Sequence, residues 1–584
     1  MGDIIEINGP LVRIRLPDVL NGEQVKIGKL GLVGEVIGRD AELAMVQVYE
    51  STEGVRPGES VVALGHPLVV ELGPGLLGQI YDGVQRPLLR IQALSGDHIA
   101  RGLEVPSLDR ERRWAFTPNV ELVVGGDVKG GMVLGTVPET RAIIHRILVP
   151  PNVAGKLLEI VPAGEYSVEE VIARICDKDG HEYPLKLYHR WPVRIPRPYA
   201  RRDHAIAPLI TGQRILDTFF PLVKGGKGAV PGPFGAGKTV VQQQIARWSN
   251  ADIVIYVGCG ERGNELVDIL ETFPELNDPH TGRSLMERTL LVANTSNMPV
   301  VAREASIYVG VTLAEYYRDQ GYDVVMVADS TSRWAEALRE VAGRLGQMPV
   351  EEGYPAYLAS RLAAFYERAG LVNTLSGKNG SVTLIGAVSP PGGDFSEPVT
   401  SHTKEIVGTF WALSKELADA RHYPAVAWTD SFSSYVATAA QWWAEHVNHK
   451  WSEERAEALG LLIQADELAR IVNLVGPEAL SPTQRWILEG ANLLKEGLLQ
   501  QSALDEVDCY SSPEKQFTLL DLILQIYHEG QAVLDRGFPI QQLMSLAILG
   551  RARRIKGVYS SNQIEGLRNF AKEIHAEFQR LLIE

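Results

Sequence analysis

Residues 232–241 read GPFGAGKTVV, and this stretch decides the fold of the segment around it. The pattern G-x-x-x-x-G-K-[ST] is met at every fixed position by Gly232, Pro233, Phe234, Gly235, Ala236, Gly237, Lys238 and Thr239. Its glycines let successive backbone N–H groups turn inward on phosphates, and the dipole of the following helix adds to the attraction. In this pattern the lysine reaches the β- and γ-phosphates, and the Thr239 hydroxyl ligates Mg²⁺.

The sequence around this loop predicts an α/β domain over residues 195–440. An apolar strand ends at Val230, and TVVQQQIARW (239–248) continues as a helix. Apolar runs alternate with helical or loop segments, which is typical of parallel α/β units. The candidate strands are GAVPG (228–232), DIVIYVG (252–258), TLLVAN (289–294), DVVMVAD (323–329) and SVTLIGAVS (381–389).

Segments of two other structural classes flank this domain in the sequence. Residues 1–70 form short β-like runs separated by Gly, Asp and Pro, which predicts a small β-barrel, and 71–109 is a connecting segment. The barrel runs are IIEI, LVRIRL, LVGEVIG, LAMVQVY and SVVAL. Residues 441–584 are rich in Glu, Gln, Ala and Leu, with Phe517, Leu520, Leu524 and Tyr527 at helical spacing. That segment predicts an antiparallel helical bundle.

Residues 110–194 predict an inserted β-rich module. VVGGDVKGGMVLGTV (123–137) and ILVPPNVAGKLLEIVPAG (147–164) are two tandem stretches of strands and glycine turns. Their pattern resembles biotinyl and lipoyl carrier domains, which hold a modified lysine in the turn between the halves. The corresponding turn here, PETRAIIHR (138–146), contains no lysine. We therefore expect a barrel-sandwich-like bulge and not a swinging arm.

Composition narrows the functional classes. With 57 Lys and Arg against 72 Asp and Glu, the net charge of the 584 residues is −15, which disfavours nucleic-acid binding. Cys176, Cys259 and Cys509 are too widely spaced for a zinc site and fit a reducing compartment. The start MGDIIEINGP predicts no signal peptide, and no run of about 18 apolar residues predicts a membrane span.

Two strand ends carry further candidate residues. Asp329 closes the apolar run VVMVA, where a P-loop fold presents a carboxylate to the magnesium shell. The turn GCGERGNE (258–265) follows the next strand after the P-loop helix and places Glu261 and Arg262 at the carboxyl edge of the sheet. A carboxylate there suits activation of an attacking water, and a guanidinium suits charge that develops in the transition state. Taken alone, the pair could also be a solvated salt bridge.

Several motifs together resemble the catalytic A subunit of V/A-type ATPases over the whole chain. They are GPFGAGKTV, VGCGERGNEL, ANTSNMPVVAREASIYVG, ADSTSRWAEALRE, EEGYPAYLASRLAAFYERAG, GAVSPPGGDFSEPV and YHRWPVR. The module at 110–194 is the strongest discriminator, since the related F-type β subunit lacks it. The Pro-Phe-Gly core of the loop also differs from the Gly-Ala-Gly type of F-type β chains.

The resemblance implies roles for individual residues. Nucleotide contacts would extend from Gly232 to Val240, with Lys238 and Thr239 on phosphate and Mg²⁺. Glu261 would activate water, and Arg262 would contact phosphate. Asp329 would join the magnesium shell through water, with Arg333 of DSTSR nearby.

The base side of the nucleotide site is implied in the same way. Tyr423 in RHYPAV matches an aromatic that stacks on adenine, although a tyrosine before proline can equally be a packing residue. In LLQQSALDEVDCY (498–510) this chain has Leu504 where the family usually has a second aromatic, which would loosen base stacking.

The resemblance also implies the subunit assembly in which the chain works. Three A and three B-type subunits would alternate in a ring around a central D/F-type stalk, held by peripheral E/G-type stalks on the cytoplasmic face of a membrane ion channel. The neighbouring B-type subunit would supply the arginine finger. H⁺ or Na⁺ would be transported, and ATP made or consumed.

Three alternatives remain at this stage. A silent nucleotide-binding subunit would be expected to lose Glu261 or Lys238. A hexameric RNA translocase would need basic, aromatic-bearing loops that the acidic sequence does not show. A secretion-type export ATPase would lack the 110–194 module.

Overall fold

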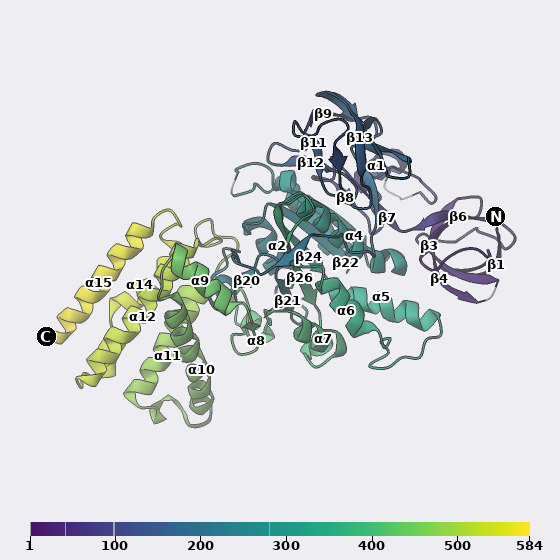
Figure 1. Ribbon diagram of the computed structural model, residues 1–584. Helices are drawn as coiled ribbons and strands as arrows, with labels where there is room; N and C mark the ends of the chain where they lie inside the picture. Colours follow the sequence, from purple (N-terminus) through teal and green to yellow (C-terminus); the bar gives the residue numbers. More distant parts are fainter. Residues whose placement is uncertain (1, 41, 97–99, 280, 584) are drawn as a thin grey trace. The chain divides into compact units, whose positions relative to one another are not determined.

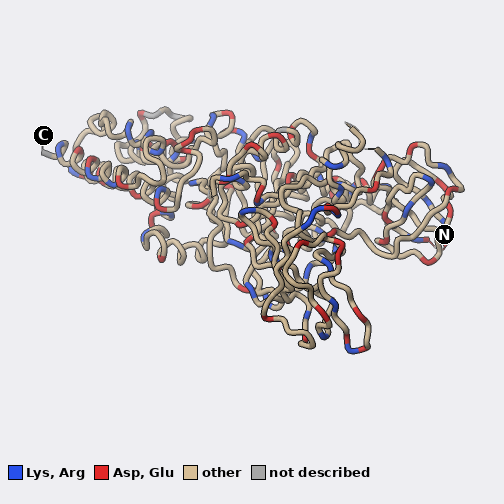
Figure 2. Tube along the Cα trace, turned by 90° about the horizontal axis from the view of Figure 1, so that it is seen from above, with Lys and Arg blue, Asp and Glu red and all other residues tan. Residues whose placement is uncertain are grey.

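A computed structural model describes residues 2–40, 42–96, 100–279 and 281–583. The chain divides into two compact units. The first comprises Met1–His204, Ala251–Val388 and Ser396–Ile406, and the second comprises Ala205–Asn250, Ser389–Phe395 and Val407–Glu584. Figure 2 shows basic and acidic residues interspersed along the chain, as the mixed composition leads one to expect.

The first unit begins with a closed barrel in the strand order β1-β2-β5-β4-β3-β6 (Figure 1). The strands are β1 Gly2–Asn8, β2 Leu11–Arg15, β3 Glu23–Ile27, β4 Leu32–Asp40, β5 Leu43–Val48 and β6 Ser60–Pro67. Alternate residues such as Val12 and Ile14 fill the interior because side chains of a strand point to opposite faces. The predicted barrel is therefore confirmed, and β3 is a strand that the sequence pattern missed.

The inserted module consists of two four-stranded sheets, ordered β12-β11-β9-β14 and β10-β13-β15-β16. The strands are β9 Arg113–Pro118, β10 Asp127–Val128, β11 Val133–Pro138, β12 Ile144–Leu148, β13 Gly155–Ile160, β14 Gly164–Ser167, β15 Val171–Cys176 and β16 Glu182–Lys186. The module ends in β17 His189–Pro192, which pairs with β7 Val69–Leu72 immediately after the barrel. A β-rich module at this place confirms the predicted fold.

A buried hydrogen-bonded cluster, here called the Glu139 hub, joins the module to helix α4 (Val300–Asp319). Glu139 Oε1 accepts the backbone N–H groups of residues 75–77 at 2.8, 2.9 and 3.1 Å. His145 Nδ1 lies 2.7 Å from Glu139 Oε2, and its Nε2 lies 2.7 Å from the Tyr316 hydroxyl. The Tyr317 hydroxyl donates to Glu139 at 3.1 Å. Burial opposes ionisation of Glu139, but these partners hold its pKa below its ordinary value.

The rest of the first unit is an α/β layer in which β26, β24, β22, β23 and β8 pair in parallel in that order. The parallel strands are β8 Ile80–Tyr81, β22 Ile253–Glu261, β23 Thr289–Thr295, β24 Asp323–Asp329 and β26 Asn379–Val388. Two antiparallel strands extend its edge, β25 Gly370–Asn373 and β18 Arg201–Asp203. Its remaining helices are α1 Leu88–Ser95, α3 Gly263–Glu275, α5 Thr331–Arg344, α6 Leu358–Tyr366 and α7 Pro398–Ile406.

The second unit begins with short strands around the phosphate-loop segment. Its strands are β19 Pro208–Leu209, β20 Leu222–Val223, β21 Lys227–Pro231, β27 Thr409–Phe410 and β28 Phe432–Ser433. β21 is parallel to β27, and β28 is antiparallel to β27. Helix α2 Lys238–Trp248 follows β21. The predicted strand-loop-helix order around residues 232–239 is thus present.

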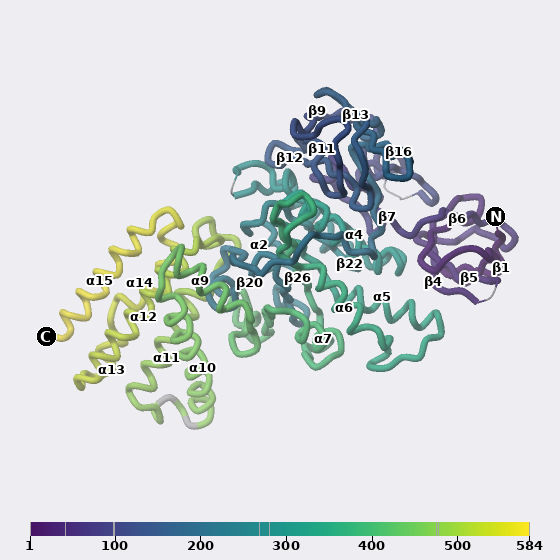
Figure 3. Tube along the Cα trace, in the orientation of Figure 1, coloured from purple at the N-terminus to yellow at the C-terminus, as the bar shows by residue number. Residues whose placement is uncertain are grey.

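The C-terminal part of the second unit is helical, as predicted (Figure 3). Its helices are α8 Lys415–Asp419, α9 Val436–His446, α10 Trp451–Val475, α11 Pro482–Leu494, α12 Pro513–Asp535, α13 Ile540–Met544, α14 Ala547–Ala552 and α15 Ile564–Ile583. Phe517, Leu520 and Leu524 of α12 are buried at the predicted helical spacing. Across the described ranges, no helix has the length and apolar character that a bilayer crossing requires.

Candidate active site

Residues 232–237 form a tight loop between β21 and α2, and Lys238 and Thr239 are the first two residues of α2. Gly235 and Gly237 have φ values of 79° and 89°, a left-handed conformation that glycine adopts without strain. Gly232 is needed for a different reason, since a Cβ there would lie 2.7 Å from Leu413 Cβ. The backbone conformation therefore explains Gly235 and Gly237, and lack of space for a side chain explains Gly232. Phe234 in the same loop is 76% exposed.

Lys238 folds back over this loop. Its Nζ donates to the carbonyl oxygens of Gly232 at 2.8 Å and Pro233 at 3.0 Å. The ammonium is thereby held above the loop at the start of α2, where the helix dipole is positive. Thr239 occupies the next position in the first turn of α2 and is half-buried. A cationic donor and a hydroxyl thus flank the same helix N-terminus, which fits a phosphate with a divalent cation.

Tyr423 lies beside the phosphate loop within the same unit. A Cβ placed on Gly237 would lie 3.8 Å from two carbons of the Tyr423 ring. The residue is 43% exposed, so part of its surface is open to a ligand. The Tyr423 carbonyl oxygen accepts the Gln501 N–H at 2.7 Å, which ties the segment that contains Leu504 to it. Leu504 is 97% exposed.

In the first unit, Glu261 and Asp329 end the two neighbouring parallel strands β22 and β24. Gly258 of β22 is in register with Asp329. Because carboxyl ends of parallel strands lie at one edge, the two acidic residues lie at the same edge, as the sequence predicted. Asp329 is buried, Glu261 is half-buried, and the Asp329–Ser330 peptide is cis.

Arg333 is brought against the turn that carries Glu261. Gly260 has a φ of 71°, and a Cβ there would lie 3.0 Å from Arg333 Cβ and 2.8 Å from Arg303 Cδ. Helix α5 begins after Ser330, whose side chain accepts the Arg333 N–H. The Arg333 guanidinium donates to both oxygens of Glu336 at 2.9 and 3.0 Å. Only glycine fits the left-handed turn between these two arginines.

The electrostatics of this edge are dominated by acidic groups. Burial raises the pKa of Glu261 to about 8, and the negative charges of Asp329 and Glu265 add to the rise. Arg333 opposes it. A carboxylate with a raised pKa in a protected position is the arrangement that a general base requires.

Arg262 differs from this acidic group in its exposure to solvent. It is exposed and precedes the first residue of α3. Within the first unit the structure therefore groups Glu261, Asp329 and Arg333, and within the second it groups the phosphate loop, Lys238, Thr239 and Tyr423.

Two functional candidates were missed by the sequence analysis. Glu265 shares a hydrogen bond with Glu261, and the Tyr256 hydroxyl donates to Asp329 Oδ2 at 3.1 Å. The short separation along the chain could have indicated the first, because Glu265 lies in the first turn of α3, four residues after Glu261 at the end of β22. Tyr256 sits within an apolar run and gives no such signal.

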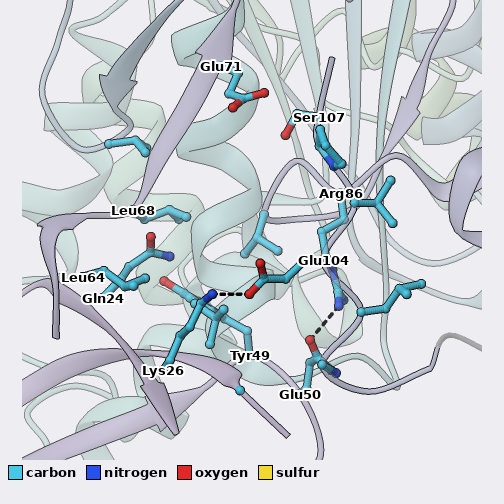
Figure 4. A pocket seen from close by; sticks show the side chains of 18 of the residues that line it. Gln24, Lys26, Tyr49, Glu50, Leu64, Leu68, Glu71, Arg86, Glu104 and Ser107 are labelled. Carbon is cyan, nitrogen blue, oxygen red and sulfur yellow. Dashed lines mark hydrogen bonds and ion pairs between the residues drawn. The ribbon is translucent and has the colours of Figure 1, made fainter. Parts of the chain in front are cut away.

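A cavity of about 520 Å³ lies elsewhere in the first unit, between the barrel and the segment 102–110 (Figure 4). Its charged lining residues pair with one another: Lys26 with Glu104, and Arg86 with Glu50 at 2.8 Å. Its described lining contains none of the residues predicted for nucleotide binding or catalysis. The cavity is therefore separate from the candidate active site.

Four family models match the chain in succession. They are the β-barrel domain of the ATP synthase alpha/beta family (1–65), the barrel-sandwich domain of ATP synthase alpha/beta subunits (105–194), the nucleotide-binding domain of the ATP synthase alpha/beta family (212–433) and the C-terminal domain of V and A type ATP synthase (440–544).

Full-length relatives and one solved structure extend these matches. The V-type ATP synthase alpha chain of Nitrosococcus oceani is 72% identical, covering 100% of this chain and 98% of the relative. The A subunit of the A-type ATP synthase of Methanopyrus kandleri is 53% identical, covering 100% and 99%. The secretion ATPase EscN of enteropathogenic E. coli has a TM-score of 0.63 over 90% of this chain, but at 22% identity it shows only a shared fold. The chain therefore belongs to the family of V- and A-type ATP synthase alpha (A) subunits.

Proposed function

We propose that this chain is the catalytic subunit of a rotary ATPase, which hydrolyses ATP by in-line attack of water or runs the reverse reaction. The observation that carries the proposal is the position of Glu261 at the end of β22, next to Asp329 and Arg333, in a chain that matches A subunits over its full length. A half-buried carboxylate at such a strand end can accept the proton of the attacking water.

The phosphate loop has the donors for a triphosphate. Residues 232–240 would contact the nucleotide, with Lys238 exchanging its present carbonyl partners for phosphate oxygens. The Thr239 hydroxyl and the Asp329 carboxylate, the latter through water, are hard oxygen ligands suited to Mg²⁺. When bound, Mg²⁺ neutralises charge on the phosphates. Arg262 and Arg333 would contact phosphate and stabilise negative charge that develops on it.

The competing functions are less well supported. A silent subunit would not need Glu261 in its protected position. The likeness to EscN concerns the fold, and the 105–194 match to the ATP synthase barrel-sandwich domain favours the synthase family over a secretion ATPase. For an RNA translocase, the net charge of −15 and the interspersed charges in Figure 2 offer little attraction to phosphate backbones.

The partners of the chain are also part of the proposal. It would alternate with a B-type subunit in an A₃B₃ ring, with the transition-state arginine finger supplied across the interface by the B-type neighbour. Central D/F-type and peripheral E/G-type stalks would couple the ring to a membrane channel for H⁺ or Na⁺, which places the chain on the cytoplasmic side. We propose that the chain divides into the segments 1–70, 71–109, 110–194, 195–440 and 441–584. Separate domains would then make these contacts with the partner subunits.

Native purification of the tagged chain tests this assembly. We expect a B-type subunit in equal amount, with stalk proteins at lower abundance, in mass analysis of the purified material. ATP hydrolysis should appear in the assembled fraction and be absent from the isolated chain, since the isolated site lacks its finger. Full activity of the chain by itself would contradict the proposed interface, and a chain that is inactive in both forms would contradict a catalytic role.

The base side of the site gives a separate prediction. Tyr423→Ala should raise KM for ATP about tenfold with a smaller effect on kcat, because stacking on an aromatic ring contributes about 1–3 kcal/mol per base. Leu504→Phe is the matched gain-of-contact variant and should lower KM several-fold, by about the same stacking contribution. Both are measured by steady-state hydrolysis in the assembled complex. Equal nucleotide affinity in Tyr423→Ala and the unmodified complex would contradict a role of Tyr423 in binding adenine.

A further inference from the structure

The Tyr256 side chain makes a contact that the reaction proposed for this site does not use. Tyr256 lies in β22, two residues before the position in register with Asp329 of β24. Its hydroxyl donates to Asp329 Oδ2 at 3.1 Å, and both side chains are buried, at 1% and 3% exposure. The contact therefore links the middle of one strand to the carboxyl end of its neighbour.

The ring of Tyr256 is held in one orientation. Phe273 of α3, itself 0% exposed, packs edge-on against it with ring centroids 5.8 Å apart. In the contact with Asp329 the phenol is the hydrogen-bond donor, and the Asp329 carboxylate is the acceptor.

A hydrogen bond from a fixed donor to one oxygen of a carboxylate restricts rotation about its Cβ–Cγ bond. It therefore favours one direction for the other oxygen, Oδ1, before any ligand arrives. At metal sites, loss of a group that orients a ligand typically costs about 10–100-fold in metal affinity, and because Asp329 is proposed to act through water we expect the low end of this range.

We propose that Tyr256 is a positioning residue, whose hydroxyl orients the Asp329 carboxylate for the divalent cation that accompanies the nucleotide. This inference rests on the proposed role of Asp329 in the magnesium shell. A purely structural role makes a different prediction, because phenylalanine would fill the same space against Phe273 and leave cation binding unchanged.

The test measures the cation-dependent part of nucleotide affinity in the assembled complex. The Kd of radiolabelled ADP is determined by equilibrium dialysis with Mg²⁺ and with EDTA, and the ratio of the two gives the gain due to Mg²⁺. Tyr256→Phe should reduce this gain about tenfold and leave the Kd in EDTA unchanged. The matched control is Tyr81→Phe, which removes the hydroxyl of another fully buried tyrosine in the same unit, one that donates to the Ser107 carbonyl, and should change neither value.

Three further variants connect the effect to Asp329. Asp329→Asn should remove most of the gain, and Tyr256→Phe added to Asp329→Asn should have no additional effect, since the hydroxyl acts only through that carboxylate. Phe273→Leu keeps the hydroxyl but loosens the ring, so it should give a smaller loss in the same direction. If the Tyr256→Phe chain does not assemble, Phe273→Leu still allows the effect to be measured.

Each contrary outcome has its own meaning. An unchanged gain in Tyr256→Phe, with the gain lost in Asp329→Asn, overturns the positioning role and leaves the proposed metal site intact. An unchanged gain in Asp329→Asn overturns the metal role of Asp329 and the positioning role with it. Additive losses in the double variant show that Tyr256 acts by another route, which also overturns the proposal.

Discussion

Glu261→Gln is expected to reduce ATP turnover by the assembled complex about 10²–10⁴-fold, the usual contribution of a positioned general base. Glutamine has nearly the same shape, but its amide cannot take up the proton of the attacking water. Because binding depends on the phosphate loop and not on this carboxyl, the nucleotide Kd should stay within about twofold. Steady-state hydrolysis and titration calorimetry measure the two quantities.

Thermal stability separates loss of chemistry from misfolding in this variant. Folding raises the pKa of Glu261 from 4.5 to about 8, so the contribution of its protonated form to stability is lost as the pH rises through about 8. Glutamine mimics the protonated form and avoids that loss. At pH 8.5 the variant should therefore have a Tm equal to or above that of the unmodified chain. Glu271→Gln, an exposed change in helix α3, which follows Glu261 in the chain, serves as the control and should alter neither turnover nor Tm. Normal hydrolysis by Glu261→Gln would remove Glu261 from the mechanism.

Lys238→Ala is expected to act earlier in the cycle, on nucleotide binding itself. A charge-assisted hydrogen bond contributes about 1.5–3 kcal/mol, so ADP and ATP affinity should fall about 10–100-fold. The loss has two sources in this structure, because Lys238 would bind phosphate and also bridges the carbonyls of Gly232 and Pro233 in the present loop. Hydrolysis at saturating ATP should be low as well, because the lysine contacts the phosphates on which charge develops.

Calorimetric titration of ADP checks this result. Lys572→Ala, on the exposed side of α15 in the same unit, removes a lysine whose Nζ bonds locally to Asn569 and is the matched control. An unchanged affinity in Lys238→Ala would mean that residues 232–239 do not hold the phosphates. Together with Glu261→Gln, the pair distinguishes a binding defect from a chemical one.

The sequence was sufficient to predict the structure wherever one local feature of the chain determines it. Long apolar runs located β22 and β24, and the second of them ends in Asp329. Glu261 was predicted in a turn after residue 258, whereas β22 continues to it. Glycine positions located the phosphate loop because the left-handed φ values at Gly235 and Gly237 restrict the choice of residue. The roles of Arg333 and Tyr423, in contrast, came from resemblance to a family and remain proposals.

The rest depends on which segments pair, and a single sequence does not contain that information. Strand β3, with the sequence EQVKI, is mostly polar and becomes a strand because it closes the barrel between β4 and β6. Tyr256 could be read only as a core residue until the register of β22 and β24 placed its hydroxyl on Asp329. The two-residue strands β27 and β28 are too short to show any periodicity.

The Glu139 hub makes one carboxylate of the inserted module important for the stability of the first unit. A Glu139→Leu change would leave three peptide N–H groups at residues 75–77, the His145 ring and the Tyr317 phenol buried without their shared partner. Each such group costs about 1–3 kcal/mol, and the total is comparable with the whole stability of a domain, about 5–15 kcal/mol. A single substitution far from the nucleotide could therefore prevent the unit from folding without touching any residue of the reaction.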